Sequence, residues 1–239
     1  MRDKRITTVL FDLDGTLLPM ELEAFTNTYF QLLAKKAAPY GYDPKALVAA
    51  VWKGTKAMIQ NDGSRTNDQR FWSVFAGELG EEVLRLRPVF DRFYAEEFHG
   101  AKAATRENPL ARKAVDGLKA RGYQVALATN PLFPAVGVAT RLSWIGLTPE
   151  DFSYVTSYEN SSYCKPNPAY FTQVLEALGK RPDQCLMVGN DVGEDAVAAA
   201  QAGLSAYLIT DCLENGRGDD ASRFAQGSFE AFMKFAGIE

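Results

Sequence analysis

The 239-residue sequence predicts an α/β fold with a doubly wound, mainly parallel sheet and a helical region inserted after the first strand. Three observations support this prediction. An apolar run rich in β-branched residues, residues 6–11, lies close to the N-terminus. Residues 19–100 then show apolar positions at helical spacing and no convincing strand. From residue 108 onwards, helical segments alternate with short apolar runs, which is typical of a Rossmann-like sheet.

The composition is compatible with two domains. With 46% hydrophobic residues, the chain can bury an α/β core and retain enough residues for a second, smaller domain. No run approaches the roughly 20 apolar residues that span a bilayer, and the charged start leads into a short strand rather than a signal peptide. We therefore expect a cytoplasmic protein with no membrane partner. The net charge of −4 and the scattered Lys and Arg residues argue against nucleic acid as a partner.

Scarce residue types exclude several kinds of site. His99 is the only histidine, so a zinc cluster of several histidines is impossible, and no Gly-x-Ser-x-Gly motif accompanies it. Cys164, Cys185 and Cys212 form no close pair, and we expect them to act as small apolar residues. The sequence contains no Gly-x-x-x-x-Gly-Lys-Ser/Thr loop, which argues against a P-loop nucleotide hydrolase.

The first predicted strand, residues 6–11, ends at two aspartates. Asp12 and Asp14 follow it, and Gly15 allows the chain to turn sharply. In an open parallel sheet the carboxyl ends of the strands border the crevice where ligands bind, so both carboxylates can face that crevice. Two carboxylates this close repel each other unless a cation or a shared proton intervenes. The pair therefore indicates a reactive site, with a polar strand end before an Asp-Gly turn as the alternative.

The inserted region, residues 19–100, is expected to form a separate helical lid. Breaks at Gly41 and at residues 61–64 divide it into four or five helices. The expected helices include residues 24–38, 44–59, 68–79 and 81–98. Seven large aromatic side chains recur along these helices, and we interpret them as the core of the lid, with a binding surface as the alternative. The seven are Trp52, Phe71, Trp72, Phe75, Phe90, Phe93 and Tyr94.

The rest of the chain completes the predicted sheet. Helices are expected over residues 109–121, 134–144, 168–178 and 229–235, with an alanine-rich helix that ends at Gly203. Strands are expected over residues 123–130, 154–156, 185–189 and 205–210. Residues 1–18 and 101–239 are thus predicted to form the sheet domain, and residues 19–100 the helical one.

Polar residues follow several of these elements. They are Asp12 and Asp14 after the first strand, Thr129 and Asn130 after the second, Lys165 in a loop, and Asp191 and Asp195 after strand 185–189. Because the carboxyl ends of parallel strands meet at one edge of a sheet, these groups can come together. Four carboxylates and one ammonium leave an excess of negative charge, which a divalent ion would reduce. Mg²⁺, which prefers oxygen ligands, fits this set of residues.

These motifs resemble those of the haloacid dehalogenase-like (HAD) superfamily of hydrolases. Residues 12–16, Asp-Leu-Asp-Gly-Thr, match its first motif, and Thr129 matches its second. Lys165, which precedes a proline, matches the third, and residues 189–195 match the acidic fourth. The motifs occur in the family's order, and the resemblance covers the sheet-forming part of the chain. The helical insert after the first motif resembles the family's C1 type of cap.

The resemblance implies a role for each catalytic candidate. Asp12 would attack phosphorus and form an aspartyl-phosphate. Asp14 would protonate the leaving alcohol and then activate the water that hydrolyses the acyl phosphate. Thr129 and the neighbouring backbone N–H, at Asn130, would bind phosphoryl oxygens, while Lys165 would neutralise charge on the nucleophile and the substrate.

The resemblance also implies a Mg²⁺ site. Asp12, the backbone carbonyl of Asp14, and Asp191 would hold the ion. The fourth motif reads Gly-Asn-Asp where many relatives have Gly-Asp, so Asn190 is the alternative to Asp191 as the ligand or a neighbour of it. Asp195 keeps the usual spacing from Asp191 and is expected to ligate the ion or to support its ligands, with a helix cap as the alternative.

The implied function is a Mg²⁺-dependent phosphatase that hydrolyses a small phosphorylated metabolite, as a monomer or a homodimer. Asp14 argues against a dehalogenase, because dehalogenases of the family lack that aspartate. A phosphomutase, which uses both aspartates, and a non-catalytic binding protein on the same scaffold are the alternatives. Nothing in the insert identifies the leaving group. We interpret Lys53, Lys56 and Arg65 as solvated charges, with contact to a second anionic group of the substrate as the alternative.

Overall fold

The computed structural model of the protein describes residues 5–238 and contains a five-stranded sheet in which every neighbouring pair is parallel. The strand order is β2-β1-β3-β4-β5. The strands are β1 (Thr8–Phe11), β2 (Gln124–Leu127), β3 (Cys185–Gly189), β4 (Ser205–Ile209) and β5 (Ala225–Gly227). Phe11 lies in register with Leu127 on β2 and with Val188 on β3. The residues that follow these three strands therefore meet at one edge of the sheet.

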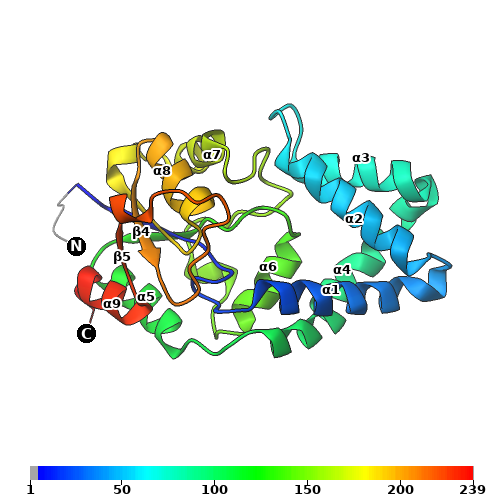
Figure 1. Ribbon diagram of the computed structural model, residues 1–239, viewed down its shortest axis with the longest axis horizontal. Coiled ribbons are helices and arrows are strands. Elements are labelled where there is room, and N and C mark those ends of the chain that lie inside the picture. The colour runs from blue at the N-terminus through cyan, green and yellow to red at the C-terminus, as the bar shows by residue number, and fades with distance from the viewer. Residues whose placement is uncertain (1–4, 239) are drawn as a thin grey trace.

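Helices cover both faces of the sheet. Since successive side chains of a strand point to opposite faces, each face has apolar side chains that pack against its own helices. The helices of this region are α5 (Pro109–Ala120), α6 (Ala135–Ser143), α7 (Pro168–Leu178), α8 (Ala198–Gln201) and α9 (Phe229–Ala236). Short 3₁₀ helices lie at Pro149–Asp151, Pro182–Gln184 and Ala221–Arg223, and one more, Ala38–Tyr40, lies in the helical segment described below. On β1, Val9 and Phe11 belong to one apolar core, which includes residues of α5 and α9. Leu10 belongs to another, which includes residues of α7 and α8. The predicted doubly wound α/β fold is confirmed (Figure 1).

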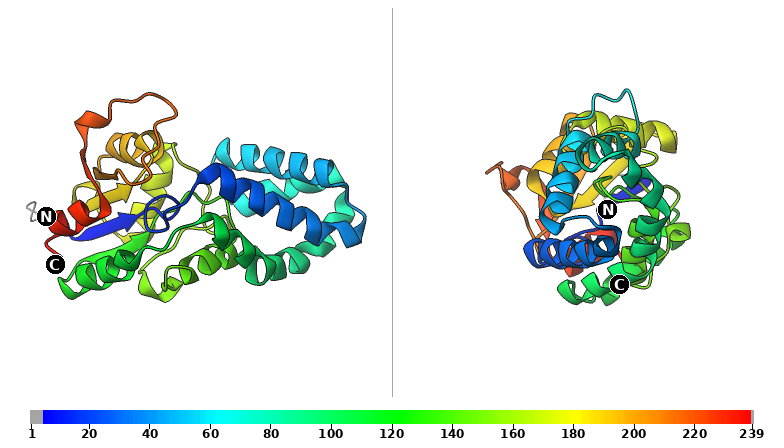
Figure 2. Two further views of the ribbon diagram at one scale, coloured as in Figure 1. Left: turned by 60° about the horizontal axis from the view of Figure 1, so that its bottom comes forward. Right: turned by 90° about the vertical axis from the view of Figure 1, so that its right-hand side faces the viewer.

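A helical segment, residues 22–95, extends to one side of the sheet (Figures 1 and 2). It contains α1 (Leu22–Ala37), α2 (Pro44–Ile59), α3 (Asn67–Leu79), η2 (Glu81–Leu86) and α4 (Arg87–Ala95), and η3 (Glu97–Ala104) follows it. The single helix predicted over residues 81–98 is wrong. Pro88 lacks an amide hydrogen and fits only the first turn of a helix, so α4 begins at Arg87 and the residues before it form the separate 3₁₀ helix η2. Within residues 5–238, no helix has the length and apolar character that crossing a membrane requires.

Two strand assignments differ from the prediction. Residues 154–156 do not form a strand of the sheet, because only Val155 makes a bridge, to Leu127. At the opposite edge, β5 pairs with β4 and was not predicted. Its sequence, Ala-Gln-Gly, has low β-propensity, so its extended form depends on pairing with β4 and not on its own residues.

The helical segment contacts the sheet region through side chains as well as through its two chain connections. The connections lie side by side, with Met20 paired to Thr105 in an antiparallel bridge. A further contact is made by the fully buried Asn67 at the start of α3. Its side-chain amide donates to the carbonyl of Pro131 and to Sγ of Cys164, each at 3.3 Å. One amide thus links α3 to two loops of the sheet region.

Candidate active site

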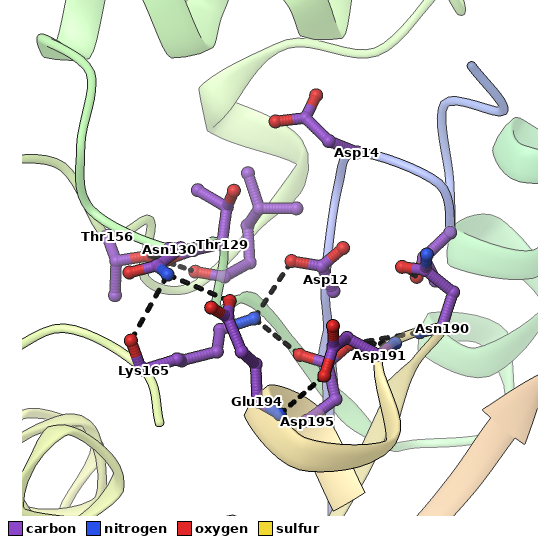
Figure 3. Close-up of polar contacts among 12 residues, drawn as sticks. Asp12, Asp14, Thr129, Asn130, Thr156, Lys165, Asn190, Asp191, Glu194 and Asp195 are labelled. Carbon is purple, nitrogen blue, oxygen red and sulfur yellow. Dashed lines mark hydrogen bonds and ion pairs between the residues drawn. The ribbon is translucent and has the colours of Figure 1, made fainter. Parts of the chain in front are cut away.

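The site residues predicted from the third motif and the first aspartate meet at the carboxyl edge of the sheet, around the ammonium group of Lys165 (Figure 3). The backbone N–H of Asp12 donates to the carbonyl of Val188 on β3 at 2.9 Å, which fixes Asp12 directly after β1. Lys165 Nζ donates to Asp12 Oδ1 at 2.9 Å and to Asp195 Oδ1 at 2.6 Å. All three side chains are buried, so one cation joins the first motif to the fourth.

Asp195 organises the turn after β3. Its Oδ2 accepts hydrogen bonds from the backbone N–H groups of Asn190 and Asp191, each at 3.0 Å, while its Oδ1 binds Lys165. It lies in η6 (Val192–Val197), which is wound as a π-helix. Both carboxylate oxygens of Asp195 therefore bind protein donors, and the residue holds the loop that carries the other acidic groups.

The charges in this cluster shift the pKa values of its members. Burial lowers the pKa of Lys165, but the carboxylates of Asp12 and Asp195 together raise it well above its ordinary value. Burial raises the pKa of Asp12 to about 7, the Lys165 ammonium opposes that rise, and the Asp195 carboxylate adds to it. Lys165 is therefore an ammonium at neutral pH. The positive charge near Asp12 does not fully offset the cost of burying its carboxylate.

Glu194 belongs to this site and was not predicted from the sequence. Its Oε2 accepts a hydrogen bond from Asn130 Nδ2 at 2.9 Å, and the same amide donates to the carbonyl of Lys165 at 3.3 Å. Burial raises the pKa of Glu194 to about 7, and the Lys165 ammonium opposes that rise. Its only signal in the sequence is its place directly before Asp195 in the acidic fourth motif. Asn130 is thus held between the second, third and fourth motifs.

Asn190 has its side chain fully engaged with other parts of the protein. Its Oδ1 accepts a hydrogen bond from Thr16 Oγ1 at 3.0 Å, and its Nδ2 donates to the carbonyl of Cys212 at 2.8 Å. It also packs closely against Gly15, where φ is +86° and a Cβ would lie 2.3 Å from Asn190 Nδ2. Asn190 therefore holds the loop of the first motif in place, and only glycine fits at position 15.

Asp191 lies on the cavity side of the same turn. One of its carboxylate oxygens accepts the backbone N–H of Glu194 at 2.7 Å. Burial raises the pKa of Asp191, which indicates a carboxylate with little compensating positive charge. Asp191 lines the same cavity as Asp12.

Thr129 follows β2, and hydrogen bonds to its backbone carbonyl hold it in place. Its carbonyl accepts hydrogen bonds from the hydroxyl groups of Thr156 and Tyr170, at 2.8 and 2.9 Å. Its buried side chain lines the cavity next to the acidic residues. The structure thus brings the second motif to the same site as the other three.

Asp14 lies apart from the hydrogen-bonded groups around Lys165 (Figure 3). Its carboxylate forms an ion pair with Arg141 of α6. Arg141 is completely buried, and its guanidinium carbon lies 4.3 Å from the centre of the Phe133 ring. The structure therefore does not place Asp14 in the cluster around Lys165. Arg141 was not predicted from the sequence, although it is the only charged residue of α6. A lone arginine in an apolar helix is a signal of a buried partner, because a buried charge needs one.

A comparison with protein families identifies the family of this chain. The model of the family described as "haloacid dehalogenase-like hydrolase" matches residues 6–203, which include all four motifs around the site. The chain belongs to the haloacid dehalogenase-like hydrolases. The predicted membership of this superfamily, and with it the prediction of a hydrolytic enzyme, is confirmed.

Curated relatives of this HAD hydrolase are phosphatases whose names give different substrates. The chain is 26% identical to the glyceraldehyde 3-phosphate phosphatase of Methanothermobacter thermautotrophicus, over 91% of this chain and 92% of that protein. It is 26% identical to the phosphoglycolate phosphatase of Nitrosospira multiformis, over 89% of this chain and 86% of that protein. A solved HAD phosphatase from Thermococcus onnurineus has a TM-score of 0.61 at 21% identity, and the match covers 98% of this chain and 99% of that one. That likeness shows a shared fold.

A cavity of about 350 Å³ extends from the acidic cluster of this HAD hydrolase into the helical segment. It begins at Asp12, Asp14 and Thr129 and continues between α1, α2, α3 and α4. The interpretation of the aromatic residues of this segment as core alone is incomplete, because six of the seven also line the cavity. The six are Trp52, Phe71, Trp72, Phe75, Phe90 and Tyr94.

The acidic oxygens of this HAD hydrolase fit a hard divalent cation. Within residues 5–238, no three His, Cys, Asp or Glu side chains converge into a metal cluster of their own. Protein sites for Mg²⁺ commonly use only one or two carboxylates, together with water and substrate phosphate. Asp12 and Asp191 supply two such carboxylates at one cavity, and both have pKa values raised by burial. A cation bound between them would offset the excess of negative charge there.

Proposed function

We propose that this protein is a Mg²⁺-dependent phosphatase that hydrolyses a small-molecule phosphomonoester through an aspartyl-phosphate on Asp12. The observation that carries the proposal is the buried Lys165 ammonium held between Asp12 and Asp195, at 2.9 and 2.6 Å. An ammonium in that position partly neutralises a carboxylate nucleophile, so that it can approach a phosphate that is also anionic. The phosphatase names of the curated relatives support phosphate esters as the substrate class.

The first half-reaction transfers the phosphoryl group to the protein. A carboxylate oxygen of Asp12 forms a bond to phosphorus while the bond between phosphorus and the alcohol oxygen breaks. Lys165 is already fixed by Asp195, so its charge needs no reorganisation as the reaction proceeds. Thr129 binds the phosphoryl oxygens from the end of β2. Mg²⁺, when bound, supplies further charge screening between the carboxylate and the phosphate.

Asp14 is assigned the two proton transfers. It donates a proton to the oxygen of the leaving alcohol, and then takes a proton from the water that attacks the phosphorus of the aspartyl-phosphate. The second step releases inorganic phosphate and regenerates the Asp12 carboxylate. In the structure the Asp14 carboxylate is turned towards Arg141, so these transfers require a change in its side-chain conformation.

Three groups are proposed to hold Mg²⁺, namely the carboxylate of Asp12, the backbone carbonyl of Asp14 and the carboxylate of Asp191. Asp191 is preferred to Asn190, because both polar side-chain atoms of Asn190 are bound to other protein groups. Asp195 supports the site by binding the backbone of this loop and the Lys165 ammonium.

We also propose that residues 19–100 form a C1-type cap and that residues 1–18 and 101–239 form the catalytic core. The division of the cavity supports this arrangement. The acidic and phosphate-binding groups come from loops that follow strands of the sheet, whereas most of the aromatic lining comes from α1 to α4. The first set is suited to the chemistry and the second to recognition of the alcohol.

Phosphate release from p-nitrophenyl phosphate in the presence of Mg²⁺ tests the proposal. We expect Asp12→Asn and Lys165→Met to reduce turnover by a factor on the order of 100 or more. Lys53→Met is the matched control, because Lys53 is exposed and pairs with Glu78 away from the site. Equal activity of the two lysine variants would contradict the proposed role of Lys165. A phosphomutase would instead return the phosphoryl group to a second hydroxyl of its substrate, with little release to water.

A further inference from the structure

We propose that the substrate of this site carries a bulky apolar or aromatic leaving group and no second anionic group. This inference rests on the proposed phosphatase function. The cavity begins at Asp12 and Asp14 and continues into the helical segment, so it lies where the alcohol part of a phosphomonoester extends from the reacting phosphorus. The nature of its walls therefore selects the alcohol.

The walls of this cavity are aromatic on several sides. Rings from α1, α2, α3 and α4 and from a loop of the sheet region line it, and they include Phe25, Trp52, Phe71, Phe75, Phe90 and Phe133. The rings also fix one another, since the centroids of Phe71 and Phe75 are 5.1 Å apart and those of Phe75 and Phe90 are 6.0 Å apart. A preformed aromatic wall favours a ligand with a flat or bulky apolar surface.

The charged side chains that line the cavity are acidic. Among the residues described by the structure, none of the lining side chains is Lys or Arg, whereas Asp91 and Glu214 line it in addition to the acidic residues of the motifs. Lys53, Lys56 and Arg65, which were considered from the sequence as contacts for a second anionic group, do not line it. A carboxylate or a second phosphate on the alcohol would therefore meet carboxylates of the same sign and no cation.

Four of the polar aromatic side chains of the wall are hydrogen-bonded in two pairs. The hydroxyl groups of Tyr29 and Tyr94 form a hydrogen bond of 2.8 Å, and Trp72 Nε1 donates to the hydroxyl of Tyr158 at 3.3 Å. The nearby Arg87 is ion-paired with a carboxylate and stacked on Trp72, 4.7 Å from the ring centre. An anionic alcohol would thus find neutral hydroxyl groups but no cation among the described residues of the wall, so burying its charge there is unfavourable. An apolar ring needs no cation.

The proposal predicts a substrate preference different from the one in the name of the Nitrosospira multiformis phosphoglycolate phosphatase, because phosphoglycolate carries a carboxylate beside its phosphate. Two alkyl esters test the difference directly, namely benzyl phosphate and 4-carboxybenzyl phosphate. They share a ring and a poor alcohol leaving group and differ by one carboxylate. We expect kcat/KM for benzyl phosphate to be higher than that for 4-carboxybenzyl phosphate by a factor on the order of 100. It should also be higher than that for ethyl phosphate, by about 10-fold or more.

Paired variants show whether the cavity causes this preference. Thr55 lines the cavity on α2, so Thr55→Lys introduces a cation there, and Thr55→Met introduces similar bulk without charge. We expect only the lysine variant to raise kcat/KM for 4-carboxybenzyl phosphate relative to benzyl phosphate, by about 10-fold or more. Phe75→Leu should lower the ratio of benzyl to ethyl phosphate. Phe93→Leu, at a fully buried position of α4 outside the cavity lining, should leave that ratio unchanged.

Binding of two phosphonates by calorimetry, with Mg²⁺ present, separates this inference from the proposed function. Benzylphosphonate should bind at least about 10-fold more tightly than 4-carboxybenzylphosphonate, and this requires no turnover. Faster hydrolysis of 4-carboxybenzyl phosphate or 2-phosphoglycolate than of benzyl phosphate would overturn the inference and leave the phosphatase proposal intact. Binding of benzylphosphonate with no hydrolysis of any ester would overturn the phosphatase proposal and support the assignment of the cavity.

Discussion

The carboxylate of Asp14 is ion-paired with Arg141, whose guanidinium is completely buried and lies over the Phe133 ring. Asp12, only two residues earlier, binds the Lys165 ammonium instead. The two aspartates of the first motif therefore have different cationic partners on different parts of the chain. The two carboxylates thus have different environments, as the proposal of different chemical roles requires.

Neutralising Asp14 should destabilise the protein through Arg141. Asp14→Asn leaves a buried guanidinium without its anion, and we expect the free energy of unfolding to fall by about 1–3 kcal/mol. The loss should be below that of a fully buried pair, because the Asp14 side chain is 25% exposed. Adding Arg141→Met should restore most of the stability but not the activity. Urea unfolding of the single and double variants measures this, and an equally unstable double variant would show that the ion pair is not the cause.

The covalent intermediate should form on Asp12 alone. Asp12→Asn removes the nucleophile and should form no adduct. Asp14→Asn should still be phosphorylated by p-nitrophenyl phosphate, because p-nitrophenolate leaves with little protonation, but hydrolysis of the adduct should slow by about 100-fold or more. Rapid quenching and mass spectrometry should then detect phosphate on Asp12 that is released by hydroxylamine. An adduct on Asp14, Thr129 or a cysteine would mean that the roles are assigned incorrectly.

Asp191 and Asn190 should differ in their effects on metal binding. Asp191→Ala should weaken Mg²⁺ binding by about 10-fold or more, because it removes a carboxylate at the proposed metal site. Asn190→Ala should mainly lower the free energy of unfolding, by about 1–2 kcal/mol, since it removes the partners of Thr16 Oγ1 and of the Cys212 carbonyl. Titration of activity with Mg²⁺ and urea unfolding of both variants separate the two effects. The reverse ranking of metal affinities would place the ligand at Asn190.

Removal of divalent ions should abolish turnover. Without a cation, the Asp12 carboxylate must approach an anionic phosphate with Lys165 as its only direct cationic contact in the described part of the chain. Treatment with EDTA should stop phosphate release, Mg²⁺ should restore it, and Mn²⁺ should restore part of it. EDTA already saturated with Mg²⁺ is the control for effects of the chelator itself. Full activity of metal-free protein would rule out the proposed metal site.

Much of the sheet could be predicted from the sequence because its strands have a strong apolar pattern. The central strands β1 and β3 are runs of buried residues, and each ends at a polar motif. The edge strand β5 could not be predicted, because Ala-Gln-Gly is extended only through its pairing with β4. The start of α4 was predicted too early, at residue 81, because helical spacing is continuous over residues 81–98, although Pro88 marks the true start of α4.

The site was predictable where a motif residue follows a strand of the sheet, and less so where a contact depends on how a helix packs. Asp12 and Lys165 lie together as the strand ends predict, although 153 residues separate them. The partnership of Asp14 with Arg141 depends on how α6 packs, over a separation of 127 residues, and no local pattern encodes it. The cavity shows the same limit. Helical spacing identifies Phe75 as inward-facing, but it cannot distinguish a filled core from the wall of a cavity.

The position of Asn67 connects recognition of the alcohol with the groups that hold the phosphate. Asn67 begins α3, which carries three aromatic residues of the cavity wall, and its amide binds Pro131 and Cys164. Pro131 directly follows Asn130 in the chain, and Cys164 directly precedes Lys165. We therefore expect a ligand that displaces α3 to move the loops of those two residues as well. If binding of the alcohol in the cavity changes the affinity of the loops for phosphate in this way, bound phosphate must change the affinity of the cavity for the alcohol by the same factor.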